Sequence, residues 1–356
     1  MHWAPKMRRS ALVAGTTIGL VATVLSAGPA FAAPRDLQQV RMQVMDLEAK
    51  AEAANERYNE ASLRLNEISS SVRNLKKKVN RERRALEVVL GSVDDLARAT
   101  YTSGGVDTSL QILLAEDPVQ FLAQAAALDQ LAQSQAADLR QTQTARLRLA
   151  QTEAALKQKQ SAARKVRNEM ASARREARER LADAEKVLNS LQAAERRRLA
   201  AMAADERRAA LAAAASAASS LGSGASGAGG GFSGGSRAMA AVRYALSQVG
   251  DRYVAAAAGP SAFDCSGLTM MAWRQAGISL PHYSYSQYRR VRKIPLSQAQ
   301  PGDLVFYFGG SVHHVGIYIG NGKMVHAANP RSGVLVSNIL GPWYSQHFTG
   351  IGRVVG

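Results

Sequence analysis

The chain contains one cysteine, Cys265, in 356 residues, and it stands directly before an apolar run, Leu268 to Ala276, that ends at Gly277. This pattern predicts a helix with the cysteine at its N-terminus. There, unpaired backbone N–H groups and the positive end of the helix dipole favour the thiolate, which is the nucleophilic form. A lone cysteine is also commonly an inert apolar side chain. By itself, Cys265 therefore leaves a nucleophile and a structural thiol both open.

Two histidines downstream favour the nucleophile. His314 belongs to a predicted strand at 314–319, and His326 belongs to the next one at 323–328, beyond a Gly320-Asn321-Gly322 turn. Paired strands would make the two imidazoles neighbours. One imidazole can then take the thiol proton while a second polar group orients it. Zinc is the weaker alternative, because the fourth ligand would have to be His313, which points to the opposite face of a regular strand.

The last third of the chain predicts an α+β domain. Helices are expected at 239–249 and 265–276, followed by strands at 303–308, 314–319, 323–328 and 334–339. Helices first and strands afterwards are typical of an antiparallel sheet with helices on one side. Residues 237–356 are enough for a separate hydrophobic core.

The preceding two thirds predict a long α-helical coiled coil over residues 33–215. Apolar residues recur at steps of three and four, which is the heptad pattern: Leu37, Val40, Val44, Leu47, Ala51, Ala54, Tyr58, Ala61, Leu65, Ile68, Val72, Leu75 and Val79. Ser103-Gly104-Gly105 and Pro118 interrupt it, so a helical tip is expected near 101–118 and a return helix at 119–215. The simplest arrangement is an antiparallel pair, with dimerisation as the alternative. A Gly/Ser/Ala-rich linker is expected at 216–236.

The N-terminus predicts export. Lys6, Arg8 and Arg9 precede an apolar stretch, and Ala30-Phe31-Ala32 supplies small residues for signal peptidase, so residues 1–32 are interpreted as a signal peptide. The net charge of +17 favours an anionic partner. Export argues against nucleic acid, and leaves a membrane surface or anionic wall polymers. The expected location is secreted, at the cell wall.

The motifs of the C-terminal third resemble the NlpC/P60 family in order and spacing. They are Phe263-Asp264-Cys265-Ser266-Gly267-Leu268, Leu280-Pro281 with Ser284 and Gln287, Pro301-Gly302-Asp303-Leu304-Val305, His314-Val315-Gly316-Ile317-Tyr318 and Met324-Val325-His326-Ala327. The resemblance implies a papain-like fold. It also implies cleavage of peptidoglycan stem peptides between D-isoglutamate and the following diamino acid, often meso-diaminopimelate, without a cofactor or metal.

The same resemblance assigns roles to individual residues. Cys265 would be the nucleophile, His314 the general base and acid, and His326 the orienting residue. The substrate site would include four further residues: Tyr253, Asp264, Ser266 and Ser284.

One departure keeps a second class of function open. Family members usually follow the tyrosine with an aromatic residue and a glycine pair, whereas this chain has alanine at every position of 255–258. Alanine resists backbone geometries that glycine allows. The alternative is a non-enzymatic coiled-coil scaffold with a degenerate domain that binds wall peptides.

The whole layout resembles actinobacterial division-associated wall hydrolases. That resemblance implies a coil that restrains the hydrolase, or recruits it through a membrane complex at the division site. A basic cluster, Arg289, Arg290, Arg292 and Lys293, is a candidate contact for anionic wall polymer, with a plain solvated surface as the alternative.

Overall fold

A computed structural model describes residues 36–102, 118–223 and 233–354. The predicted signal peptide, nearly all of the predicted tip and the centre of the predicted linker lie outside the described residues. Within these ranges, no helix has the length and apolar character that crossing a membrane requires.

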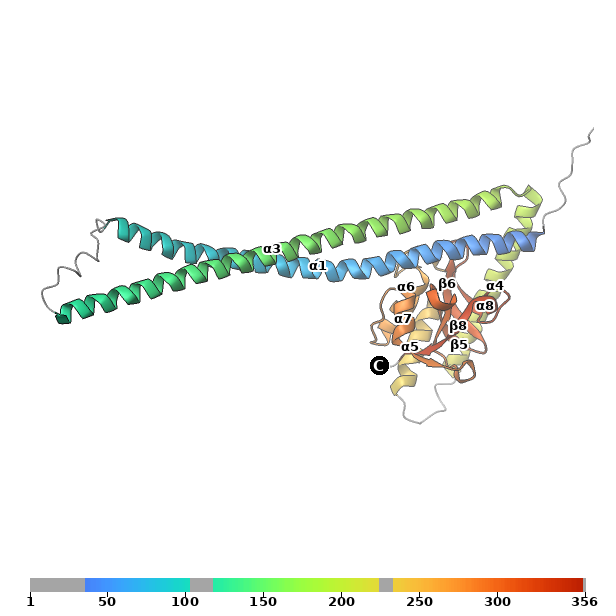
Figure 1. Ribbon diagram of the computed structural model, residues 1–356. Coiled ribbons are helices and arrows are strands. Elements are labelled where there is room, and N and C mark those ends of the chain that lie inside the picture. Colours follow the sequence, from blue (N-terminus) through green and yellow to red (C-terminus); the bar gives the residue numbers. More distant parts are fainter. Residues whose placement is uncertain (1–35, 103–117, 224–232, 355–356) are drawn as a thin grey trace, which may run out of the picture. The chain divides into compact units, whose positions relative to one another are not determined.

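Two long helices form the N-terminal part: α1 (Leu37–Thr102) and α3 (Pro118–Asn189), which run side by side (Figure 1). Ion pairs join Arg57 to Glu176 and Arg64 to Glu169, each at 2.8 Å. Residue numbers rise along α1 as they fall along α3, so the pair is antiparallel, as expected. The buried contacts between the helices are mostly small side chains, including Ala54, Ala61, Ala173, Ala177 and Ala184.

The predicted return helix is wrong in one respect, because it does not run unbroken to residue 215. It ends at Asn189, and a separate helix, α4 (Ala193–Ser223), follows. The Gln192 backbone N–H donates to the Glu195 carboxylate (2.9 Å), which caps the new helix. The first part of the predicted linker is helical up to Ser223, since alanine is the strongest helix former.

Helix α4 packs on the C-terminal domain instead of only leading to it. Ala210 and Ala214 are buried in the same apolar core as that domain's own residues, and the Arg207 guanidinium donates to the Gly250 carbonyl (3.1 Å). Helix α5 (Ser233–Ser247) begins before the predicted linker ends and packs on α6 (Cys265–Gln275). The core of the domain therefore draws on residues upstream of 237.

The C-terminal domain contains a six-stranded antiparallel sheet in the order β3-β8-β4-β5-β6-β7. The strands are β3 (Arg292–Ile294), β4 (Leu304–Tyr307), β5 (His314–Gly320), β6 (Lys323–Asn329), β7 (Gly333–Asn338) and β8 (Phe348–Arg353). β1 (Arg252–Tyr253) and β2 (Ala262–Phe263) form a small parallel pair. Short helices complete the domain: α7 (Ser284–Arg290), α8 (Tyr344–His347) and the 3₁₀ turns Leu296–Gln298 and Gly309–Ser311.

The core lies between α6 and the central strands. Leu268 and Ala272 of α6 pack with Phe306, Val315 and Ile317 of the sheet. Side-chain alternation sends Val315 and Ile317 to this face, as the sequence pattern predicts. The α+β expectation, with an antiparallel sheet preceded by a long helical region, is confirmed (Figure 1).

Candidate functional site

Cys265 is the first residue of α6 and is fully buried. Asp264 is the N-cap of this helix: its backbone is extended, and its side chain accepts a hydrogen bond from the Gly267 N–H at 2.7 Å. The cap fixes the point at which the chain turns into the helix. The predicted position of the cysteine at a helix N-terminus is therefore correct.

Three side chains on successive strands form a hydrogen-bonded chain. His314 Nε2 lies 2.8 Å from His326 Nδ1, and His326 Nε2 lies 2.9 Å from Ser337 Oγ. Burial, together with the neighbouring His314, holds the pKa of His326 well below its usual range, so His326 is neutral. A neutral imidazole has one donor and one acceptor nitrogen. When Nε2 donates to Ser337, Nδ1 is left to accept from His314.

Gly316 makes room for this imidazole pair. A Cβ at Gly316 would lie 3.1 Å from the Cβ of His326 and 2.8 Å from the Met324 sulfur. A side chain there would displace one of them. Close packing of His326 and Met324 therefore explains why the His314-Val315-Gly316 motif has glycine at its third position.

Asp264 is the most heavily hydrogen-bonded carboxylate of the site. Besides capping α6, it accepts from His282 Nε2 (2.7 Å) and from the Ala256 N–H (3.0 Å). Burial raises the pKa of Asp264, but these hydrogen bonds and the His282 charge outweigh burial and leave it lowered. Burial lowers the pKa of His282, but the bond to Asp264 outweighs it and leaves the pKa raised. Both shifts favour an ion pair.

The alanine loop adopts the geometry for which glycine is expected. Ala256 has φ of 59°, in the left-handed region, and its N–H still reaches Asp264. Such a conformation costs a non-glycine residue about 1–2 kcal/mol. Alanine is therefore tolerated here at some cost, and the loop keeps its contact with the site. Tyr253 and Ala255 line a small cavity beside it.

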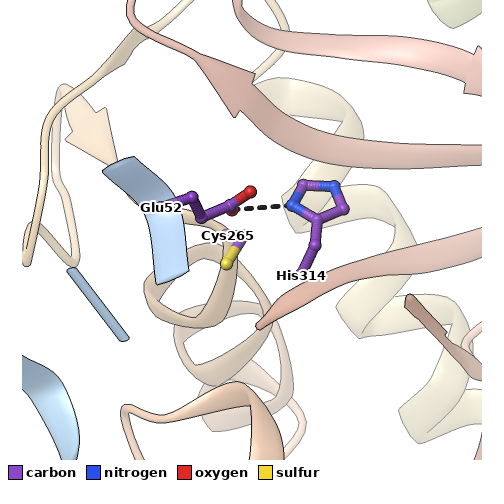
Figure 2. A group of neighbouring side chains, drawn as sticks. All are labelled: Glu52, Cys265 and His314. Atoms are coloured by element: carbon purple, nitrogen blue, oxygen red, sulfur yellow. Dashed lines mark hydrogen bonds and ion pairs between the residues drawn. The ribbon is translucent and has the colours of Figure 1, made fainter. Parts of the chain in front are cut away.

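Helix α1 supplies a side chain to the centre of the site. A carboxylate oxygen of Glu52 lies 2.7 Å from His314 Nδ1, and both side chains are buried. Glu52, Cys265 and His314 each offer an atom within 4.8 Å of the others (Figure 2). Both ring nitrogens of His314 are therefore occupied, one by His326 and the other by Glu52.

Four more residues on the same face of α1 contact the domain. The Asn55 and Asn59 amides each donate to Asp264 Oδ2 at 3.0 Å. Glu56 accepts from the Ser266 hydroxyl at 2.7 Å and from the Ser284 N–H. Glu48 forms a bidentate ion pair with Arg331, whose Nε and Nη2 atoms lie 2.6 and 3.0 Å from the two carboxylate oxygens.

This arrangement reverses the expected state of the thiol. Burial raises the pKa of Cys265 well above its usual value, and the carboxylates of Glu52, Glu56 and Asp264 raise it further. Burial and the Asp264 charge also raise the pKa of Glu56, to about 7. The helix N-terminus alone favours a thiolate. When α1 lies against the domain as in this structure, here called the seated state, the local charge is negative and the thiol of Cys265 keeps its proton.

All seven residues named from the sequence lie in one region. Cys265, His314, Ser266 and Asp264 surround Glu52 and Glu56. His326 contacts His314, while Ser284 meets Glu56 through its backbone. The seventh, Tyr253, is buried, and burial raises its pKa well above the usual value, with smaller contributions from Glu52 and Cys265. The His313 ring is not part of the group: it stacks on Phe308 with centroids 4.0 Å apart.

Sequence reasoning missed His282, Ser337 and the polar face of α1. A signal for the last was present, because Glu48, Glu52, Glu56 and Glu60 recur at intervals of four, a spacing that places them on one helix face. Asn55 and Asn59 continue that face.

Comparisons with known proteins agree on the domain. Residues 250–353 match the profile of the NlpC/P60 family. A probable endopeptidase p60 of Listeria grayi is 48% identical over 111 residues, 31% of this chain and 21% of that protein. A probable endopeptidase of Mycobacterium tuberculosis is 50% identical over 97 residues, 27% of this chain and 24% of that protein. The chain thus spans less than a quarter of the length of these relatives.

Solved structures of NlpC/P60 proteins also match about a third of the chain. An NLP/P60-family protein of Staphylococcus aureus, described as similar to a lipoprotein, is 31% identical, with a TM-score of 0.32, over 34% of this chain and 42% of that one. The P60 domain of an antigen from M. avium subspecies paratuberculosis is 32% identical, with a TM-score of 0.30, over 35% of this chain and 100% of that one.

Proposed function

Residues 250–353 are an NlpC/P60 domain, and from this premise we propose that the chain is an exported cysteine endopeptidase of peptidoglycan. Its bond would be the one between D-isoglutamate and the following diamino acid, meso-diaminopimelate in the first instance. The observation that carries the proposal is the grouping of Cys265 and His314 with His326 behind them. Cell-wall remodelling during division is the setting that we infer for it.

The reaction begins when His314 Nδ1 takes the thiol proton of Cys265. The thiolate attacks the peptide carbonyl, and the tetrahedral intermediate collapses to a thioester as His314 gives the proton to the departing amine. Water then attacks the thioester, with His314 again as base, and releases the acid and the free thiol. His326 keeps His314 in the tautomer whose Nδ1 is free to accept.

Formation of the thioester requires α1 to move away from the site. Glu52 occupies the nitrogen of His314 that must accept the thiol proton, and Glu56 occupies the Ser266 and Ser284 donors. We therefore propose a restrained enzyme: α1 covers the site until a partner binds the helical pair, with a membrane-bound division complex as the inferred partner. An unrestrained wall endopeptidase would endanger the cell that exports it.

The test is digestion of defined stem peptides by three proteins: the intact chain, residues 193–356 and the same fragment with Cys265→Ala. The fragment starts at α4 because Ala210 and Ala214 belong to the core. Faster cleavage after D-isoglutamate by the fragment, absent in the Cys265→Ala protein, is the expected result. Equal rates for chain and fragment would refute the restraint but not the activity.

The scaffold alternative is supported by one observation, the left-handed Ala256. A folded fragment that binds stem peptides without cleaving them would favour it. The strained alanine would then be the first position to change to glycine.

A further inference from the structure

The group of Glu52, Cys265 and His314 has the composition of a metal site. It combines a thiol, an imidazole and a carboxylate, all buried, within 4.8 Å of one another (Figure 2). The three residues come from α1, the start of α6 and the start of β5. They meet only when α1 is seated on the domain.

The surroundings of the thiol are electrostatically suited to a cation. The Glu56 carboxylate lies 4.0 Å from Cys265 Sγ, and Glu52 and Asp264 also raise the pKa of Cys265. Among the described residues, the ion pairs of these three carboxylates are both with imidazoles: His282 pairs with Asp264, and His314 pairs with Glu52. Buried negative charge without enough positive charge nearby is costly. A divalent ion bound at the thiol would neutralise it.

The ligand set favours zinc. Thiolate, imidazole and carboxylate bind Zn²⁺ at about 2.3, 2.0 and 2.0–2.2 Å, so ligand atoms of one tetrahedral site lie within about 4 Å of each other. The observed grouping needs only a small contraction to reach this geometry. Hard cations such as Mg²⁺ and Ca²⁺ avoid thiolates.

The structure also contains an acceptor for the second ring nitrogen of His314, the ligand histidine. A histidine that binds zinc through one nitrogen usually donates its other N–H to a fixed acceptor. His314 Nε2 lies 2.8 Å from His326 Nδ1, which Ser337 leaves free to accept. His314 Nδ1 is then the nitrogen that faces Glu52 and can hold a metal.

We propose that the seated chain binds one Zn²⁺ ion through Glu52, Cys265 Sγ and His314 Nδ1, and that the ion locks α1 over the site. Binding replaces the hydrogen bond between Glu52 and His314 Nδ1. It releases two protons to solvent, the thiol proton of Cys265 and the proton shared between Glu52 and His314, with no change of oxidation state. Water fills the fourth position. This set differs from the one considered from the sequence, because Glu52 takes the place of His326 and His313.

The lock follows from linkage. An ion that binds the seated state more tightly than the released state stabilises the seated state by the same factor. Once α1 leaves, only Cys265 and His314 of the three ligands remain. Zinc would therefore hold the restrained form, and withdrawal of zinc would favour release. The zinc site rests on the proposed restraint by α1. Its test measures metal binding, so the zinc site can be refuted while the peptidase activity is retained.

The experiment titrates Zn²⁺ into the intact chain against a chromogenic chelator, and Co²⁺ into a parallel sample. We expect one equivalent of Zn²⁺ and a thiolate-to-Co²⁺ charge-transfer band in the near ultraviolet. Cys265→Ser should abolish the band. Glu52→Gln should weaken Zn²⁺ binding at least tenfold, since even outer contacts of metal ligands are worth about 10–100-fold.

Glu48→Gln is the matched control. It lies one turn away on α1 and loses the ion pair with Arg331, but it supplies no ligand. Retained affinity in Glu48→Gln, with a tenfold loss in Glu52→Gln, supports the site. A smaller loss in Glu52→Gln, equal losses in both variants, or no charge-transfer band with the unaltered chain would overturn it.

Discussion

At the scale of single residues, the proposed restraint by α1 would act on the chemistry as well as on access to the site. His314 has two ring nitrogens, and the proposed reaction uses both: Nε2 for orientation and Nδ1 for the thiol proton. Glu52 lies 2.7 Å from Nδ1 and so occupies the base itself. The same carboxylate helps to keep the pKa of Cys265 high, although burial is the larger cause. In the proposed enzyme, one glutamate would therefore disable the nucleophile and the base together.

Ser337 is predicted to control the tautomer of His326. In the fragment 193–356, Ser337→Ala should lower kcat about tenfold with little change in KM, the cost of one hydrogen bond of about 1.4 kcal/mol. Without the Ser337 acceptor, His326 can place its proton on Nδ1 and no longer accept from His314. Steady-state kinetics on a stem peptide measure the effect.

Ser337→Thr is the control, because it keeps the hydroxyl. It should restore most of the lost kcat. A Thr variant as slow as the Ala variant would mean that packing at this position matters, and not the hydrogen bond to His326.

At the scale of elements, α1 has two working faces. Small apolar residues such as Ala54 and Ala61 are buried against α3, while Glu48, Glu52, Asn55, Glu56 and Asn59 are buried against the domain. Polar side chains are buried on this second face because each has a partner there. A polar contact surface of this kind separates into water more easily than an apolar one, which fits the proposal that α1 leaves the site.

Asn59→Asp is predicted to release α1. The new carboxylate would face Asp264 Oδ2, which Asn59 now contacts at 3.0 Å. Two like charges at that distance in a buried site repel strongly. Cys265 is the only cysteine, so its rate of alkylation reports exposure of the site, and we expect that rate to rise at least about tenfold.

Asn74→Asp makes the same chemical change at an exposed position of α1 and should leave the alkylation rate unchanged. If both variants were alkylated at the rate of the unaltered chain, the contact between α1 and Asp264 would not control access to Cys265.

The seated state of α1 is also predicted to weaken as pH rises. Burial, and then the Asp264 charge, raises the pKa of Glu56 from 4.5 to about 7 when seated. Between pH 4.5 and about 7, Glu56 therefore binds a proton in the seated state that it lacks in the released state. The contribution of this proton to the stability of the seated state is full below about pH 4.5 and is lost as pH rises through about 7. The raised pKa of His282 acts in the same direction if release also loosens its pair with Asp264.

The alkylation rate, corrected for the intrinsic pH dependence of the thiol in fragment 193–356, should rise from pH 5 to pH 7.5 by at least about tenfold. Glu56→Gln resembles the protonated side chain and should remove most of that rise. A rise of the same size in Glu56→Gln would assign the dependence to another group.

At the scale of the whole molecule, local patterns predicted most of the fold. The four strands expected around His314 and His326 lie within a residue of β4, β5, β6 and β7, because alternation and turn residues define them. The glycine turn at 320–322 has positive φ at all three residues and pairs the two histidine strands as expected. Strand β8 and helix α7 went unpredicted, since neither has a clear periodicity of its own.

The contact between α1 and the site could not be predicted in the same way. Glu52 and His314 are 262 residues apart, and no local pattern links them. Heptad analysis classes Glu52 and Glu56 as positions outside the apolar seam, which are solvated in an isolated coil. Their partners become evident only when the domain is placed beside the helix. Likewise, no local pattern predicts that Ala210 and Ala214 of α4 belong to the core of the domain.

The positive charge of the whole chain leads to the last prediction. The net charge is +17, and three arginines of the basic cluster, Arg289, Arg290 and Arg292, are exposed, while Lys293 lies over the Tyr288 ring at 3.8 Å. If the cluster binds anionic wall polymer, glutamine at its four positions should lower the salt concentration that elutes the chain from purified walls, because screening weakens such contacts. The matched control removes four exposed charges from α1, at Lys76, Lys77, Arg81 and Arg84. Equal shifts in both variants would show that net charge alone governs retention, whereas a larger shift for the cluster variant would identify the domain surface that meets the wall.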